Sequence, residues 1–358
     1  MKDFGKEFQV LNTYTYLNTA ASGILSNALV KWRTEHDSDF AEHGSVFREK
    51  HKPHIESVRS TVARFFKAEV GQVALVPNFS FGFNALLEGL PKKQKVLLLD
   101  RDYPSVNWAV EQRDFEVCYA KIDACAEGNI AEAIAKHAPD VFAFSLVQYL
   151  NGIKIDMKFL RQLKTDHPDL LLIGDATQFL GTEPFDFKNS PLDIVGASGY
   201  KWLLAGYGNG FFMMKAAVKD RIFPKIVGFN SAESTYTKRN EIDFISCFEP
   251  GHQDTLNYGS LEQSLRYLEE LGMDWIGQKN RELSGYAKKR FSELGWLEPA
   301  TAQRESHGTI FNVKGNRNTL DKLKASGVIC SYRGGGIRVS PHFYNSEEDI
   351  EKLIEALK

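Results

Sequence analysis

Short apolar runs alternate with amphipathic segments along most of the chain. Apolar runs cover residues 73–76, 141–146 and 170–173, and another ends at Asp100. Each has the length of a buried strand and is followed by polar residues. Apolar strands that alternate with helices predict an α/β fold, with a mainly parallel sheet and helices on both faces. Such a sheet binds ligands beyond the carboxyl ends of its strands, so we expect the site in the loops after these runs.

The pattern differs at the two ends of the chain. Ser26 is a good cap for the amphipathic helix that follows it. A long helical pattern ends near Leu271, and beyond it helices and strands are mixed. We therefore predict a large domain over residues 15–271 and a small α+β domain formed by residues 1–14 and 272–358.

Composition narrows the class of partner. The chain has 358 residues, of which 43% are hydrophobic, enough for one large core and a smaller one. Its formal net charge is −2 and it has no basic stripe, which argues against nucleic acid and against a membrane surface as partners. The four cysteines show neither CxxC nor metal-ligand spacing, so we expect free thiols and no metal. With no secretory signal and no membrane span in the sequence, we expect a cytoplasmic protein that binds small molecules.

Lys201 is the leading candidate for chemistry. It lies between Tyr200 and Trp202, just before a glycine-rich turn, and these aromatic neighbours should partly desolvate its amine. Desolvation favours the neutral amine, which can attack a carbonyl to form an imine. The alternative is a solvated loop lysine beside a hairpin.

The turn after the apolar run at residues 73–76 is a candidate phosphate site. A helix is predicted from about Ser80, so Asn78, Phe79 and Ser80 lie at a helix N-terminus. Backbone N–H groups and the helix dipole favour an anion at such a place. The alternative is that Ser80 only caps the helix.

Two further strand ends carry candidate side chains. Tyr103 follows the run that ends at Asp100 and could stack on a flat ring, or else fill the core. Asp175 follows the run at residues 170–173 and is costly to bury without a cationic partner. A protonated ring nitrogen would be such a partner; a structural arginine or a helix cap are the alternatives.

Arg333 and Arg338 lie on either side of three glycines near the end of the chain. A guanidinium is a planar fork that matches a carboxylate, so one of them could hold an amino-acid substrate. The alternative is a surface salt bridge, which contributes little.

Together these segments resemble the class V aminotransferase family of pyridoxal-phosphate (PLP) enzymes with the aspartate-aminotransferase-like fold, fold type I. That group includes cysteine desulfurases, selenocysteine lyases and isopenicillin-N-epimerase-like proteins. DATQ followed by SGYKW is the most specific part. The resemblance covers nearly the whole chain, in the family's order, through YLNTAASG, PNFSFGFNALL, DYPS, SLVQYLNG, DATQ, SGYKW, FEPGHQDT and RVSPHFYN.

The resemblance implies a PLP-dependent transferase fold, pyridoxal 5′-phosphate as cofactor and a homodimer with composite active sites. It makes Lys201 the lysine that forms the Schiff base (aldimine) and Asp175 the partner of the pyridine nitrogen. Tyr103 takes the position of the residue that stacks on the ring. The other cofactor-binding positions that it implies are Asn78, Phe79, Ser80, Gln148, Tyr149, Gln178, Ser198, Tyr200, His252 and Gln253.

The resemblance also implies substrate contacts. Arg338 matches the arginine that holds the substrate α-carboxylate, and Arg333 and Ala21 are further substrate-binding positions. The family's FEPG segment reaches the phosphate in the neighbouring subunit, often through a threonine. Here His252 and Gln253 follow that segment, and which of them makes the contact is open.

The cofactor does not fix the reaction, because several outcomes share the same first steps. Desulfurases of the family carry a nucleophilic cysteine on a loop shortly before the carboxylate-binding arginine. Here only glycines and Ile337 separate Arg333 from Arg338, and we interpret Cys330 as a strand residue. We therefore expect transamination of a small amino acid. The alternatives are a cysteine or selenocysteine lyase, an amino-acid epimerase, or a PLP-fold binding protein without turnover.

Overall fold

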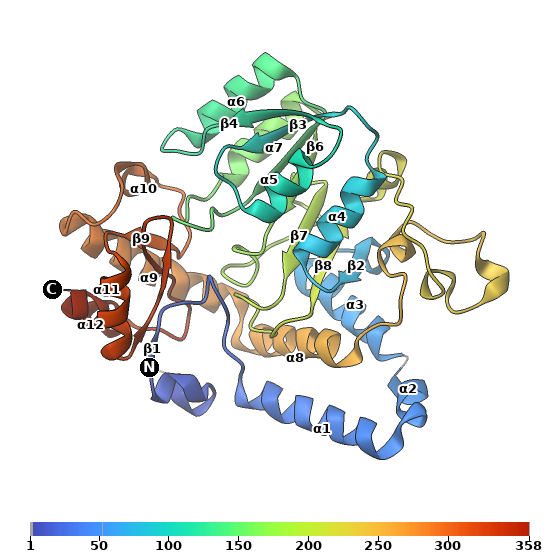
Figure 1. Ribbon diagram of the computed structural model, residues 1–358, viewed down its shortest axis with the longest axis horizontal. Coiled ribbons are helices and arrows are strands. Elements are labelled where there is room, and N and C mark those ends of the chain that lie inside the picture. The colour runs from blue at the N-terminus through green and yellow to red at the C-terminus, as the bar shows by residue number, and fades with distance from the viewer. Residues whose placement is uncertain (1–2, 52, 358) are drawn as a thin grey trace.

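A seven-stranded sheet forms the centre of the molecule in the computed structural model, which describes residues 3–51 and 53–357 (Figure 1). The strand order is β2-β8-β7-β6-β5-β3-β4. Only β8 runs antiparallel to its neighbours, so the predicted mainly parallel sheet is confirmed. The strands are β2 (Val73–Val76), β3 (Lys95–Leu99), β4 (Glu116–Ala120), β5 (Val141–Ser145), β6 (Leu171–Asp175), β7 (Ile194–Ser198) and β8 (Gly210–Met214).

Helices cover both faces of this sheet. Alternate residues of β5 demonstrate it, since Val141 and Ala143 pack in one core with α4 and α5 while Phe142 and Phe144 pack in the other with α3, α6, α7 and α8. Burial on both faces is why the strands read as continuous apolar runs. The helices of the larger part are α1 (Asn27–His43), α2 (Ser45–His51), α3 (His54–Phe66), α4 (Phe79–Gly89), α5 (Pro104–Glu111), α6 (Ala126–His137), α7 (Met157–Asp166) and α8 (Thr255–Leu271).

A smaller unit with its own core lies to the left of the sheet in Figure 1, in orange and red. Its antiparallel sheet has the order β11-β12-β9, and β1 pairs in parallel with β10. Its elements are β1 (Thr15–Tyr16), α9 (Met273–Glu293), α10 (Pro299–Gln303), β9 (Phe311–Val313), α11 (Arg317–Ala325), β10 (Val328–Ile329), β11 (Ser331–Arg333), β12 (Gly336–Val339) and α12 (Glu347–Leu357).

The N-terminal segment runs through this smaller unit before it enters α1. Thr15 pairs with Val328, and Leu17 is fully buried in the same core as Ile337 and Val339. The domain boundaries inferred from the sequence stay a prediction. Short 3-10 helices complete the described chain at Phe4–Lys6, Gln9–Asn12, Val70–Gln72, Ala216–Asp220, Asn230–Ala232, Tyr236–Lys238 and Ile245–Phe248.

The predicted cap of the first long helix is confirmed. The Ser26 hydroxyl accepts a hydrogen bond from the Leu29 N–H at 3.1 Å and caps α1. Strands β4 and β7 are not among those named from the apolar runs. β4 is an edge strand with exposed residues, and β7 contains glycine, alanine and serine, so neither has a strong strand signal. Within the described ranges, no helix is both long and apolar enough to cross a membrane.

Candidate active site

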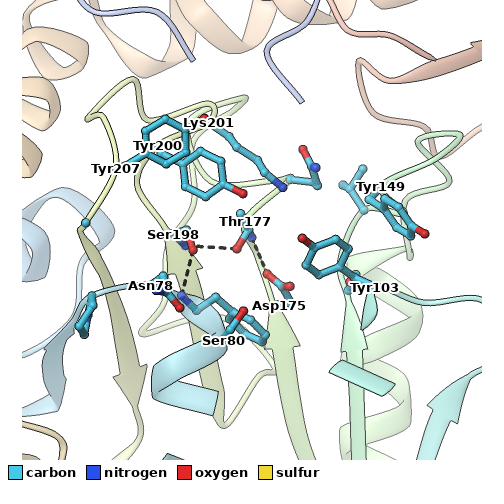
Figure 2. A pocket seen from close by; sticks show the side chains of 16 residues that line it. Asn78, Ser80, Tyr103, Tyr149, Asp175, Thr177, Ser198, Tyr200, Lys201 and Tyr207 are labelled. Atoms are coloured by element: carbon cyan, nitrogen blue, oxygen red, sulfur yellow. Dashed lines mark hydrogen bonds between the residues drawn. The ribbon is translucent and has the colours of Figure 1, made fainter. Parts of the chain in front are cut away.

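A cavity of about 480 Å³ lies at the carboxyl ends of the parallel strands. Its walls are the loops that follow β2, β3, β5, β6 and β7, as Figure 2 shows. This is where a doubly wound sheet is expected to bind a ligand. The predicted cofactor-binding residues that line it are Asn78, Phe79, Ser80, Tyr103, Tyr149, Asp175, Gln178, Ser198, Tyr200 and Lys201.

The Lys201 amine reaches into this cavity from the turn after β7 (Figure 2). Its Nζ atom is 5.4 Å from the ring centroids of both Tyr103 and Tyr200, and the residue is only 5% exposed. Burial lowers the pKa of Lys201 from its ordinary 10.5 to about 7, although the charge of Asp175 raises it. Much of the amine is therefore neutral near pH 7, and a neutral amine can act as a nucleophile or a base.

Two distant segments hold the turn that carries Lys201. The Gly23 N–H donates to the Tyr200 carbonyl at 2.8 Å, and a Cβ at position 23 would collide with the Lys201 carbonyl oxygen. The buried ring of His342 has Nε2 3.1 Å from the Trp202 carbonyl oxygen. Burial lowers the pKa of His342 to about 3, so this ring is neutral. Glycine at position 23 is what lets the N-terminal segment pack directly on the lysine turn.

Gln178 joins the loop after β6 to the same turn. Its amide nitrogen donates to the Ala20 carbonyl at 3.0 Å, and its amide oxygen accepts from the Trp202 indole N–H at 2.7 Å. Both ends of the side chain are used, so Gln178 forms a fixed part of the cavity wall.

Asp175 ends β6 with its carboxylate facing the cavity (Figure 2). One oxygen accepts a hydrogen bond from the Thr177 N–H at 2.9 Å. Burial raises the pKa of Asp175, and the Lys201 charge and the Thr177 hydrogen bonds oppose this rise. Among the described residues no cationic side chain forms an ion pair with Asp175. A buried carboxylate without an ion-pair partner is costly, and a cationic group bound in the cavity would offset that cost.

A second buried carboxylate, Asp102, was not identified from the sequence. It accepts hydrogen bonds from the Tyr103 N–H at 2.6 Å and from the Ser145 N–H at 2.7 Å. Burial raises the pKa of Asp102 to about 6, and the charge of Asp175 contributes to the rise. Asp102 therefore fixes the backbone that carries Tyr103 to the end of β5.

The N-terminus of α4 forms the opposite end of the cavity. The Asn78 side chain caps the helix by accepting from the Phe81 N–H at 2.9 Å. The Ser198 hydroxyl oxygen accepts from the Phe79 N–H at 2.9 Å. Ser80 also lines this end. Helix N–H groups and hydroxyls together are suited to a phosphate group.

Aromatic rings form the remaining walls. Tyr103 and Tyr149 meet edge to face with their centroids 5.1 Å apart. Tyr200 and Tyr207 stack at 4.7 Å, and Tyr207 lies on the wall although it was not named from the sequence. A flat ring bound beside Tyr103 would have an aromatic partner on one face.

The two arginines differ in their surroundings. Arg338 is 2% exposed, donates from Nη1 to the Tyr149 carbonyl at 2.9 Å, and leaves its Nε without a partner. Burial, together with the nearby charge of Arg333, lowers the pKa of Arg338 to about 10. Arg333 is exposed, yet its charge reaches Lys201 and contributes to its lowered pKa. An anionic group would satisfy the free Nε of Arg338.

Six predicted site residues are not among those that line the cavity: Ala21, Gln148, His252, Gln253, Arg333 and Arg338. The Gln148 side chain is taken up by the backbone, since it donates to the Arg101 carbonyl and accepts from the Leu150 and Asn151 N–H groups. His252 is exposed, and Gln253 donates to Glu249 at 2.8 Å. The roles given to these residues stay predictions.

Comparison with known proteins gives one family across nearly the whole chain. The family model "Aminotransferase class-V" matches residues 15–353. An uncharacterized aminotransferase, YcbU, of Bacillus subtilis is 24% identical over 98% of this chain and 95% of its own length. A probable cysteine desulfurase of Borreliella burgdorferi is 22% identical over 100% of this chain and 96% of its own. A solved structure of the cystine C-S lyase C-DES with cysteine persulfide has a TM-score of 0.88 at 20% identity, covering 98% of this chain and 99% of that one.

Proposed function

The chain belongs to the class V aminotransferase family and uses pyridoxal 5′-phosphate, and on that premise we propose that it transfers the amino group of a small amino acid. The observation that carries this proposal is the buried, partly neutral Lys201 amine in one cavity with an unpaired Asp175 carboxylate. An amine with a pKa near the working pH is suited to taking a proton and giving it back.

The residues of the cavity fit this cofactor. The Asp175 carboxylate lacks a cationic side-chain partner in the described chain, which suits a protonated pyridine nitrogen. The α4 N-terminus, with Ser80 and Ser198, suits the phosphate, and Tyr103 suits the ring face. When bound, the cofactor draws electrons away from the bonds at the substrate Cα.

Each protein group then has a task. Lys201 takes the proton from the substrate Cα and delivers it to the carbon on the other side of the amino nitrogen. Asp175 stays anionic and keeps the ring nitrogen protonated. Arg338 binds the α-carboxylate through its free Nε and so fixes the Cα–H bond in front of the amine.

Cysteine burial argues against a persulfide mechanism. Cys330 is 4% exposed and packs in the core of the smaller unit, where burial raises the pKa of its thiol well above the usual range. No cysteine is among the described residues that line the cavity. A reactive cysteine needs exposure and a lowered pKa, so a thiol-dependent desulfuration is disfavoured.

A lyase that eliminates a β-substituent is the second candidate function. Elimination also begins with loss of the Cα proton to a lysine, and it needs no cysteine nucleophile. The buried Cys330 is therefore compatible with it. C-DES, a protein of similar fold whose structure has been solved, is described as a cystine C-S lyase.

Incubation of the holoenzyme with a panel of amino acids tests the proposal. Transamination predicts pyridoxamine phosphate and a 2-oxo acid in equal amounts. Release of sulfide or ammonia with the cofactor unchanged would favour the lyase, and loss of optical activity alone would favour an epimerase. Lys201→Ala is the control, because removal of the lysine amine should abolish every one of these reactions.

A further inference from the structure

The hairpin of β11 and β12 presents two arginines on one face. In its register Arg333 lies opposite Gly336, and Ser331 lies opposite Arg338. Directly paired residues share a face, and so do residues two apart along a strand. Arg333 and Arg338 are therefore diagonal neighbours, and the Cα atoms at such positions are about 7–8 Å apart.

The other face of this hairpin packs away from the cavity. Ile337 is fully buried in the core of the smaller unit, and its register partner is Tyr332. The Arg317 guanidinium lies 5.5 Å from the centroid of the Tyr332 ring on that side. One face of the hairpin, with Tyr332 and Ile337, therefore packs on the core of the smaller unit, and the opposite face carries Arg333 and Arg338.

Glycines make the position of Arg333 possible. Gly334 and Gly335 have φ values of +59° and +79°, which permit the tight turn directly after Arg333. The Asn312 amide donates to the Arg333 carbonyl at 2.8 Å and holds the end of the strand. Gly336, the register partner of Arg333, has no side chain, and the Asn312 amide occupies the place where its Cβ would lie.

Neither guanidinium has an acidic partner in the part of the chain that is described: the ion pairs that involve arginine join other residues. The charges of both act on the same phenol, because Arg333 and Arg338 each oppose the rise that burial gives the pKa of Tyr149. Arg333 also contributes to the lowered pKa of Arg338, as expected for two nearby like charges. One buried and one exposed arginine therefore face the same region with their charges uncompensated.

From this geometry we infer that Arg333 binds a second acidic group of the substrate, so that the enzyme acts on an amino acid with an anionic side chain. The inference rests on the proposed function for the role of Arg338, whose buried guanidinium beside the Tyr149 carbonyl binds the α-carboxylate. Arg333, at the exposed end of the hairpin, then pairs with the distal acid. A guanidinium and a carboxylate form a charge-assisted pair that a neutral amide of the same shape does not form.

The test compares acids with their isosteric amides. Single-turnover conversion of the bound cofactor is measured with L-aspartate, L-asparagine, L-glutamate and L-glutamine. We expect one acid to react about 10- to 100-fold faster than its amide, the range for a hydrogen bond to a charged group. Arg333→Gln should remove most of this preference by slowing the acid and leaving the amide within about threefold. Arg333→Lys, which keeps the charge, should recover part of it.

Arg317→Gln is the matched control, since it removes an arginine from the other side of the hairpin and should leave the preference unchanged. An acid and an amide that react equally, or an Arg333→Gln variant that slows both alike, would overturn the inference while the proposed function stands.

A binding measurement separates the two proposals. Calorimetric titration of the holoenzyme with unreactive glutarate and butyrate needs no turnover. We expect Arg333→Gln to weaken glutarate binding about tenfold or more and to leave butyrate binding unchanged. If no amino acid converts the cofactor but this difference appears, transamination fails and the Arg333 site remains. If the difference is absent, the Arg333 site is refuted whatever the reaction.

Discussion

Replacement of Lys201 by methionine should stabilise the protein from which the cofactor has been removed. The pKa of Lys201 falls from 10.5 in its ordinary state to about 7 in the folded protein. Between these pH values the unfolded chain binds a proton that the folded chain does not bind. The folded state therefore loses stability as the pH falls from about 10.5 to about 7, and the loss is complete below that range.

The size of this effect follows from the shift. At about 1.4 kcal/mol for each pH unit, the full difference is about 5 kcal/mol. Methionine has a similar length and no charge to desolvate, so its burial avoids the penalty. We expect Lys201→Met to raise the free energy of unfolding at pH 7 by up to about 5 kcal/mol. The gain should shrink by about 1.4 kcal/mol with each unit of higher pH.

Urea denaturation of the cofactor-free wild type and variant at pH 7, 8 and 9 measures this difference. Lys322→Met is the control, because Lys322 is exposed on α11 and its amine is hydrated in both states. A Lys201→Met variant that is no more stable at pH 7 would refute a buried amine whose pKa is lowered to about 7. So would a gain that does not change with pH.

Three further predictions concern the ring partner, the link between the two parts and the stacking residue. Asp175→Asn should slow exchange of the substrate Cα proton in deuterated water by about 100-fold or more, and an unchanged rate would remove Asp175 from the mechanism. Arg304 forms an ion pair with Glu127, so Arg304→Met leaves Glu127 as a half-buried, unpaired charge and should lower the free energy of unfolding in urea by about 3–5 kcal/mol. Adding Glu127→Gln should restore part of this loss. A double variant that restores none of it would contradict the pairing. Tyr103→Ala should raise the dissociation constant of the cofactor about 3- to 10-fold while Tyr103→Phe does not, and equal effects in fluorescence titration would exclude stacking.

The sequence predicted most of the sheet because strands buried on both faces are continuous apolar runs. Those at 73–76 and 141–146 correspond to β2 and β5. Strands with a weaker apolar signal, such as β7 with its glycine and serine, depend on their neighbours for pairing and were not named. The strand order itself comes from contacts between segments far apart in the chain, which periodicity does not contain.

The convergence of Lys201 and Asp175 could be anticipated, since parallel strands end at one edge of the sheet. Their supporting residues could not. His342 reaches the Trp202 carbonyl across 140 residues of sequence, and no local pattern predicts that contact. Asp102 directly precedes Tyr103 and could have been suspected as a second strand-end carboxylate.

Chemical trapping tests the central claim, that Lys201 is the residue to which the cofactor is attached. Borohydride makes the reversible bond between the cofactor and its lysine permanent, and peptide mass spectrometry then locates the modified residue. We predict a single modified peptide that contains Lys201 and is absent after addition of a reactive amino acid before reduction. Attachment at another lysine, or no attachment in a protein that binds the cofactor, would contradict the account.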